Sequence, residues 1–277
     1  LGSLHAMLGI RYGSKESLEL IKKIFKTKSE CELLSSAQLG KEKGSFPLFD
    51  KEKYFNSYWW KHLNISESVK KEIEKIGFMR NALQSMNAPT GNTATYSQMV
   101  SSGIEPIFSL EYIRWVTVSE FERVELKNKG FKFPNRDISE WAETEHMKFT
   151  TRADEQILKG SFDGVDYEYE KNRGLIKSVL IEDYGWKFAK EFYSEENLKK
   201  MKENGIFATS ADLTIDDHVK TLEIMAHYTN MAISKTVNLP KEYPYEDFKK
   251  LYLYAHKSNI KGLTTYRAGT TVAVLEA

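Results

Sequence analysis

Apolar positions near the start of the chain recur at helical spacing. Leu18, Ile21 and Phe25 fall on one face, whereas lysine and glutamate fill most of the other positions. This pattern predicts an amphipathic helix that buries its apolar stripe. Cys31 lies on the same expected helix, where we expect it to be a small buried thiol. Because the chain has 1 cysteine, no internal disulfide can form.

A second amphipathic helix is expected between Asn64 and Gly77. The spacing from Asn64 to Glu67 suits a capping box, and glycine commonly ends helices. Residues 44–60, which precede this helix, are rich in aromatic side chains. We expect a loop that packs onto the fold, in preference to one that stacks on nucleotide bases. The inner stripe of the helix would consist of Val69, Ile73 and Ile76.

The pattern then changes to shorter runs. Residues 107–118 are rich in β-branched and aromatic side chains and predict a strand. Residues 119–205 are charged and weakly periodic. We expect them to form a peripheral insertion, serving either as a contact surface for another part of the protein or as a solvated elaboration. Short strands are expected within it at 167–169 and 178–181.

The last third of the chain alternates helices and strands. Helices are expected over 212–232 and 245–258, with a strand over 234–239 between them. Strand-like runs follow at 262–266 and 271–275. Because a helix connects successive strands, this order favours parallel βα units. The sequence therefore predicts an α/β fold.

Composition narrows the function classes. The chain of 277 residues has 40 lysines and arginines against 39 aspartates and glutamates, so no net charge favours nucleic-acid binding. No apolar run reaches the roughly 20 residues of a membrane span. The first residues also lack a basic segment followed by an apolar signal core. We expect a cytoplasmic protein that binds neither nucleic acid nor membrane.

Familiar metal and nucleotide-loop signatures are missing from the sequence. The 6 histidines form no His-Glu-x-x-His motif, and 1 cysteine leaves zinc with too few soft ligands. Neither a P-loop nor a G-x-G-x-x-G motif occurs. We expect His218 and His227 to be ordinary residues on different helix faces, and we assign no metal ligand.

The segment 88–94 has the pattern of a phosphate-binding turn. Its proline fixes the start of the turn, and its glycine allows close backbone approach. Small hydroxylated residues then begin a short helix, whose first N–H groups would suit an anionic phosphate. Alone, the pattern also fits an ordinary turn. The candidate phosphate-binding residues are Pro89, Thr90, Gly91, Asn92, Thr93 and Ala94.

Other segments, in the same order along the chain, resemble the large catalytic subunit of ribonucleotide reductases. The matching segments are residues 1–10, 42–50, 80–81, 88–94, 101–108, 232–240 and 261–267. The middle of the chain, from about 118 to 205, matches poorly. The resemblance implies a ten-stranded α/β barrel made of two antiparallel five-stranded halves. Residues 1–277 would supply most of the second half, with peripheral helices.

The resemblance also implies an activity, the reduction of ribonucleotides to 2′-deoxyribonucleotides through a radical at the 3′ carbon. In the family, the radical cysteine and the reducing cysteine pair precede the region that this chain resembles. We therefore assign no catalytic residue here and expect an upstream half, on a separate chain or within a longer protein, as partner. The sequence leaves open whether the protein forms an oligomer. The alternative is a nucleotide-binding or scaffolding remnant without chemistry.

In that scheme, the present part binds the phosphates of the ribonucleotide substrate through residues 89–94. The resemblance adds four candidate supporting residues, which belong to the matching segments on either side of the turn. They are Arg80, Asn81, Glu105 and Tyr266.

The resemblance favours one source of the radical. Members that depend on iron or manganese pass the radical through two adjacent tyrosines near their C-terminus, but residues 263–267 here read Leu-Thr-Thr-Tyr-Arg. We therefore expect adenosylcobalamin as cofactor. The alternative is a radical supplied by a metal-containing small subunit.

Overall fold

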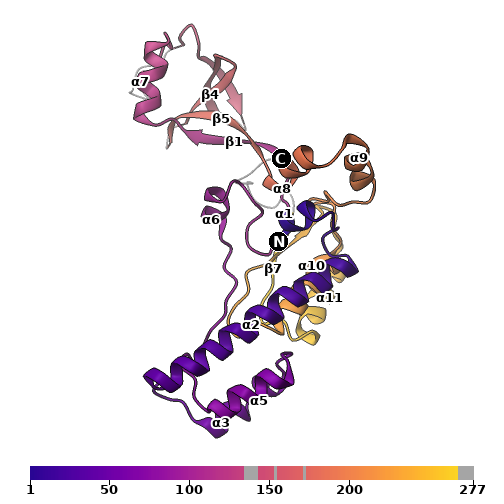
Figure 1. Ribbon diagram of the computed structural model, residues 1–277. Coiled ribbons are helices and arrows are strands. Elements are labelled where there is room, and N and C mark those ends of the chain that lie inside the picture. The colour runs from indigo at the N-terminus through magenta and orange to yellow at the C-terminus, as the bar shows by residue number, and fades with distance from the viewer. Residues whose placement is uncertain (134–142, 153–154, 171–172, 268–277) are drawn as a thin grey trace. The chain divides into compact units, whose positions relative to one another are not determined.

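The computed structural model describes residues 1–133, 143–152, 155–170 and 173–267 (Figure 1). The described chain divides into two compact units. One unit consists of residues 1–110 and 183–267, and the other of residues 111–182. The strand expected at 271–275 lies outside the described residues.

The first unit is mainly helical and carries a short parallel sheet. Its strands, β6 (Thr236–Leu239) and β7 (Thr264–Arg267), pair in parallel. Its helices are α1 (Gly2–Met7), α2 (Lys15–Lys43), α3 (Lys51–Phe55), α4 (Tyr58–His62), α5 (Glu67–Ile76), α6 (Gly91–Tyr96), α8 (Tyr184–Phe192), α9 (Glu195–Glu203), α10 (Ile215–Ala226) and α11 (Tyr245–Lys257). None of these described helices is both long and apolar enough to cross a membrane.

The amphipathic helix expected near the start is confirmed as α2. Ser14 caps it by accepting a hydrogen bond from the backbone N–H of Ser17, and Ile21 and Phe25 are buried. The burial expected for Cys31 is wrong, because its side chain is exposed. The buried stripe continues through Ser29 and Leu33. Cys31 lies midway between these two positions and therefore points to the opposite side of the helix.

The second expected helix, α5, begins later than the sequence suggests. Asn64 does not cap it, since the N-cap residue is Ser66, whose N–H and hydroxyl both donate to Glu30 of α2. The expected end at Gly77 is confirmed, with φ of 73° in the left-handed region. The aromatic segment 44–60 contains α3 and α4 as well as loop. It packs with α2 and α5, as expected, in a core whose buried residues are Leu33, Ala37, Trp60, Leu63, Ile65, Ile73 and Met79.

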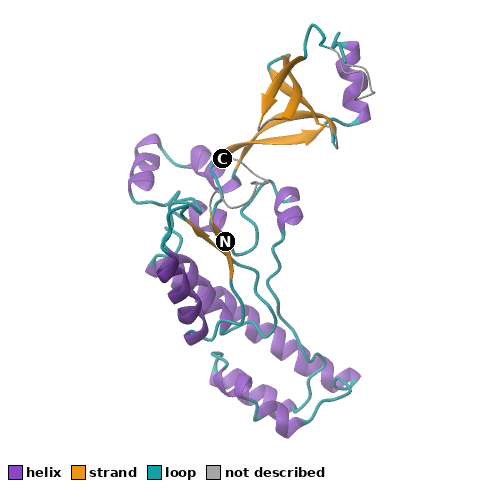
Figure 2. Cartoon of the chain, turned by 180° about the vertical axis from the view of Figure 1, so that it is seen from behind, coloured by secondary structure: helices purple, strands orange, loops and turns teal. Residues whose placement is uncertain are grey.

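The described residues of the second unit form an antiparallel sheet and the helix α7 (Glu120–Asn128) (Figure 2). The strand order is β1 (Glu111–Thr117), β5 (Gly174–Glu182), β4 (Val165–Glu170), β3 (Glu155–Phe162) and β2 (Lys148–Arg152). The strands expected at 167–169 and 178–181 are confirmed within β4 and β5. The strand expected at 107–118 is shorter than predicted. Ile107 instead forms an isolated bridge with Thr209 in the first unit, and the carbonyl of Leu110 accepts from the N–H of Asp183.

The alternation of strand and helix expected in the last third is confirmed. Thr214 and Asp217 form a reciprocal capping box that starts α10, and α11 connects β6 to β7 in a parallel βα unit. α10 packs against both α2 and β6. The fold is thus mixed α/β, but the described residues form two separate sheets and no closed barrel. Closing a barrel requires further strands beside the open edges of β6 and β7. The helices α8 and α9, within the expected insertion, belong to the first unit.

Candidate functional site

The expected phosphate-binding turn leads into α6, as the sequence predicts. Thr90 is the N-cap residue, and its side chain makes no capping hydrogen bond. The N–H groups of Gly91, Asn92 and Thr93 occupy the first turn, where no intrahelical acceptor exists. All three residues are exposed, whereas Ala94 is buried and its N–H donates to the carbonyl of Thr90 at 2.8 Å. The turn therefore presents three backbone donors to the surface.

The backbone at this turn is strained. Thr90 has φ of 52° and ψ of 27°, in the left-handed region. This conformation is unusual for a β-branched residue, and for L-residues it costs roughly 1–2 kcal/mol. Five non-glycine residues have positive φ in the described chain, and two of the others, Gln98 and Met99, lie in the loop that follows α6. Strained conformations of this kind concentrate at functional sites.

The matching segment that contains Ser-Ser-Gly-Ile-Glu-Pro, residues 101–106, lies against the turn. Gly103 has φ of 53°, and a Cβ atom on it would lie 3.0 Å from the carbonyl oxygen of Ala88 and 3.3 Å from the Thr90 hydroxyl. Only glycine combines this φ with so close an approach. The structure thus brings two segments together that the sequence analysis had linked only by order.

Asn87, the residue that precedes the turn, is fixed by the segment before β6. The N–H of Asn87 donates to the carbonyl of Ala232 at 3.1 Å, and its own carbonyl accepts from Ser234 at 2.8 Å. Asn87 and Ile233 form a parallel bridge. The Asn87 amide also donates to the hydroxyl of Thr229 at 3.0 Å. Residues 229–234 therefore hold the chain immediately before Ala88.

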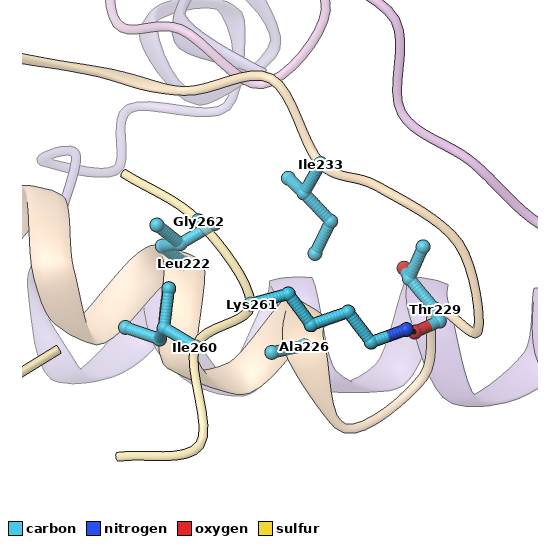
Figure 3. A pocket seen from close by; sticks show the side chains of 7 residues that line it. All are labelled: Leu222, Ala226, Thr229, Ile233, Ile260, Lys261 and Gly262. Atoms are coloured by element: carbon cyan, nitrogen blue, oxygen red, sulfur yellow. Dashed lines mark hydrogen bonds between the residues drawn. The ribbon is translucent and has the colours of Figure 1, made fainter. Parts of the chain in front are cut away.

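Lys261 in turn supports residues 229–231. Its ammonium donates to the carbonyls of Thr229, Asn230 and Met231 at 3.4, 2.5 and 3.2 Å, and Figure 3 shows its side chain running toward Thr229. Burial lowers the pKa of Lys261. The pocket in this view is lined mostly by aliphatic side chains and offers no cluster of donors for a phosphate. Its lining residues are Leu222, Ala226, Thr229, Ile233, Ile260, Lys261 and Gly262.

Lys235, which is 1% exposed, lies at the centre of a buried polar cluster. Its ammonium donates to Glu105 at 2.6 Å and to the carbonyl of Thr236 at 2.9 Å, and it lies 2.8 Å from Nδ1 of His218. Burial lowers the pKa of Lys235, while the carboxylate of Glu105 opposes this shift. Burial and the charge of Lys235 lower the pKa of His218 to about 3.

Sequence reasoning named Glu105 as a supporting residue but missed its partner Lys235 and the contact of Lys235 with His218. His218 is indeed on α10 and on a different face from the exposed His227, but it also contacts Lys235. The available signal was Lys235 itself, a lysine placed directly before the apolar strand β6 in a matching motif. Charged residues are seldom fully buried unless they are paired.

The remaining candidate residues lie elsewhere in the first unit. The backbone N–H groups of Arg80 and Asn81 donate to the carbonyl and the hydroxyl of Ser36 on α2. Tyr266 is on β7, opposite Asn238. Among the residues that the structure describes, no three His, Cys, Asp or Glu side chains are grouped to bind a metal ion. No metal-ligand set can therefore be named from them.

Comparisons with known proteins identify the family. Residues 1–266 match the family model for the ribonucleotide reductase barrel domain. The chain is 24% identical over 270 residues to the vitamin B12-dependent ribonucleoside-diphosphate reductase of Mycobacterium tuberculosis (strain H37Rv), covering 98% of this chain and 30% of the relative. It is 28% identical over 271 residues to the enzyme of the same name from Thermoplasma acidophilum, covering 98% of this chain and 28% of the relative.

A solved structure is similar in fold. The class Id ribonucleotide reductase alpha subunit of Actinobacillus ureae aligns with a TM-score of 0.52 and 18% identity, over 97% of this chain and 38% of that one. The present chain thus spans less than a third of the length of the curated relatives that it matches. The resemblance seen in the ordered motifs is confirmed, and the chain belongs to the ribonucleotide reductase barrel-domain family.

Proposed function

We propose that this chain is part of the catalytic subunit of a ribonucleotide reductase and that residues 89–94 hold the phosphates of the ribonucleotide substrate. The observation that carries this proposal is the strained turn at Thr90. It exposes three N–H groups that have no acceptor within α6, and two neighbouring segments lie against the residues at its start. A backbone conformation that costs free energy and is fixed in place suits a site that must be preorganised.

The chemistry available at the turn is binding and orientation. The N–H groups of Gly91, Asn92 and Thr93 would donate to phosphate oxygens, and the hydroxyls of Thr90 and Thr93 add two further donors. Each hydrogen bond to a charged oxygen contributes about 1.5–3 kcal/mol. A substrate held by its phosphates presents its ribose in a defined place, which is the contribution that we assign to this chain.

The radical chemistry requires groups from elsewhere in the reductase. The chain's one cysteine, Cys31, is exposed on α2 and remote in sequence from the turn. We propose that the reacting cysteines belong to the rest of the enzyme, on the same polypeptide or on a separate one. This chain would then contribute substrate binding to a shared active site.

We further propose that the enzyme uses adenosylcobalamin. Two lines support this: the names of the two curated relatives, and the residues around Tyr266, whose neighbours are Thr265 and Arg267 and not a second tyrosine. When bound, the cofactor supplies the radical that starts the reaction. We assign the described residues of this chain to substrate binding and none of them to cofactor binding.

The activity is tested by assaying ribonucleotide reduction by the complete reductase containing this chain, with and without adenosylcobalamin. We expect turnover only when the rest of the enzyme and the cofactor are both present. Turnover that instead requires a metal-containing radical subunit would contradict the cofactor proposal. Nucleotide binding without turnover under either condition would favour a binding remnant.

The phosphate site is tested by replacing Asn92 with aspartate. The new carboxylate would lie among the three donors and repel a phosphate. We expect the affinity for a ribonucleotide to fall about tenfold or more, since the repulsion would offset at least one charge-assisted hydrogen bond. The affinity for the corresponding nucleoside should not change. The free energy of unfolding should be nearly unaffected, because a carboxylate in the first turn of a helix is favourable.

Asn197→Asp is the matched control. Asn197 is an exposed residue in the first turn of α9, so the same charge is added in the first turn of another helix. This variant should bind both ligands normally in isothermal titration calorimetry. Unchanged ribonucleotide affinity in Asn92→Asp would contradict the assignment of residues 89–94.

A further inference from the structure

The ammonium of Lys235 has a complete set of buried acceptors. A lysine ammonium has three N–H donors, and three acceptors surround this one: Glu105, Nδ1 of His218 and the carbonyl of Thr236. Nδ1 must therefore accept, which places the proton of a neutral imidazole on Nε2. The ring of Tyr12 lies 6.0 Å from the ammonium. The charge is thus held in one position by groups from four parts of the first unit.

Glu105 is fixed equally firmly. One carboxylate oxygen accepts from Lys235 at 2.6 Å and the other from the backbone N–H of Thr236 at 2.7 Å. Its side chain is 26% exposed and that of Lys235 is 0% exposed, so the pair is largely removed from water. An ion pair that is partly removed from water is screened less than a surface pair. The position of Glu105 is therefore tied to the start of β6.

Glu105 belongs to the tight segment that lies against the phosphate-binding turn. Its N–H donates to the carbonyl of Ser102 at 2.9 Å, which closes a turn around Gly103. The carbonyl of Ile104 accepts from the buried hydroxyl of Tyr12 at 2.6 Å. Because Gly103 lies so close to the turn that even a Cβ atom on it would crowd the carbonyl oxygen of Ala88, a shift of Glu105 would reach the turn.

The segment that carries Lys235 also holds the residue that precedes the turn. Ala232 and Ser234 bond to Asn87, immediately before the turn, and Lys235 and Thr236 bond to Glu105, beyond it. Five consecutive residues thus fix both ends of a loop that spans residues 87–105. This arrangement makes residues 232–236 the support on which the loop conformation depends.

We propose that Lys235 is a positioning residue for substrate binding: through Glu105 it fixes the Gly103 segment against the turn at Thr90 and so sets the affinity for the substrate's phosphates. This inference rests on the proposed function of residues 89–94. Lys235 does not touch the substrate. Its effect is therefore limited to the part of the affinity that the phosphates supply.

The test compares the affinity of the complete reductase for a ribonucleoside diphosphate or triphosphate with that for the parent ribonucleoside, by calorimetry. Lys235→Met should reduce the ratio of the two affinities about tenfold, a size typical of coupling between residues that contact one another. The nucleoside affinity should stay the same. A residue needed only for the fold would change both affinities together or neither.

Glu105→Gln combined with Lys235→Met provides the second variant. It removes both charges and leaves no unpaired carboxylate, so it should fold even if the single variant does not. We expect its affinity ratio to stay reduced, because the ionic tie to Glu105 is still missing. A wild-type ratio in the folded double variant would overturn the proposal. If the wild-type protein itself did not discriminate nucleotide from nucleoside, the proposed function of residues 89–94 would be at fault instead.

Discussion

Replacing Lys235 with methionine is expected to lower the free energy of unfolding by about 3–5 kcal/mol, the usual result of removing one partner from a buried ion pair. The methionine would fill most of the space of the lysine stem. It would, however, leave the Glu105 carboxylate without its cation and Nδ1 of His218 without its donor. Urea denaturation at neutral pH measures the change, and a similar m-value in both proteins would show that the comparison is valid.

The double variant Glu105→Gln, Lys235→Met is expected to be more stable than Lys235→Met alone. A glutamine can still accept from the N–H of Thr236, and it carries no charge that needs a partner. Replacement of a whole buried pair by neutral groups is often close to neutral in stability. If the losses in the free energy of unfolding of Glu105→Gln and of Lys235→Met simply add in the double variant, the two side chains are not coupled. Such a result would contradict the geometry described here.

Periodicity alone could predict the regular part of the first unit. In α2, α10 and α11, apolar residues recur at helical spacing because one face of each helix packs on the core, and this local pattern is present in the sequence. Gly77 could be predicted as a helix end because the left-handed conformation favours glycine. The parallel pairing of β6 and β7 followed from the helix between them.

Part of the second unit escaped prediction: α7, β2 and β3 were not expected, because charged residues interrupt the apolar pattern of this region. Glu168 lies in β4 and is 3% exposed, where a buried apolar residue would be expected. It is tolerated because Arg152 of β2 and Lys159 of β3 lie 2.8 and 3.4 Å from its carboxylate. The sequence shows three charges and gives no sign that they converge. Buried charges depend on partners that only the fold supplies.

The candidate site also has a part that local sequence predicts and a part that depends on tertiary structure. The turn at 88–94 could be predicted because its proline, glycine and small residues act locally. Its supports could not, since Lys235 meets Glu105 from 130 positions away in the chain. The close packing of Gly103 on Ala88 likewise depends on tertiary structure. Cys31 was misplaced for a different reason: the expectation rested on the usual burial of a free cysteine, whereas the helical spacing of Ile21, Phe25 and Leu33 places it on the opposite side of α2.

Acidification is expected to weaken the fold before most carboxylates titrate. The pKa of His218 is lowered from 6.5 to about 3 in the folded protein, chiefly by burial and then by the charge of Lys235. Between these values the unfolded chain binds a proton that the folded one does not. The stabilisation is therefore complete above about pH 6.5 and declines as the pH falls toward 3. The slope from one such group reaches about 1.4 kcal/mol per pH unit.

Urea denaturation at pH 7, 6 and 5 measures this slope, and His218→Asn identifies its source. The amide oxygen of asparagine can accept from Lys235 as Nδ1 does, but the side chain does not titrate. Burial also lowers the pKa of His5, so this residue adds a slope of the same sign that should persist in the variant. Burial raises the pKa of Asp183, which acts in the opposite direction at lower pH. A slope between pH 7 and 5 that is the same in His218→Asn as in the wild type would contradict a neutral, buried His218. A reduced slope would mean that the imidazole must stay unprotonated for Lys235 to keep its third acceptor.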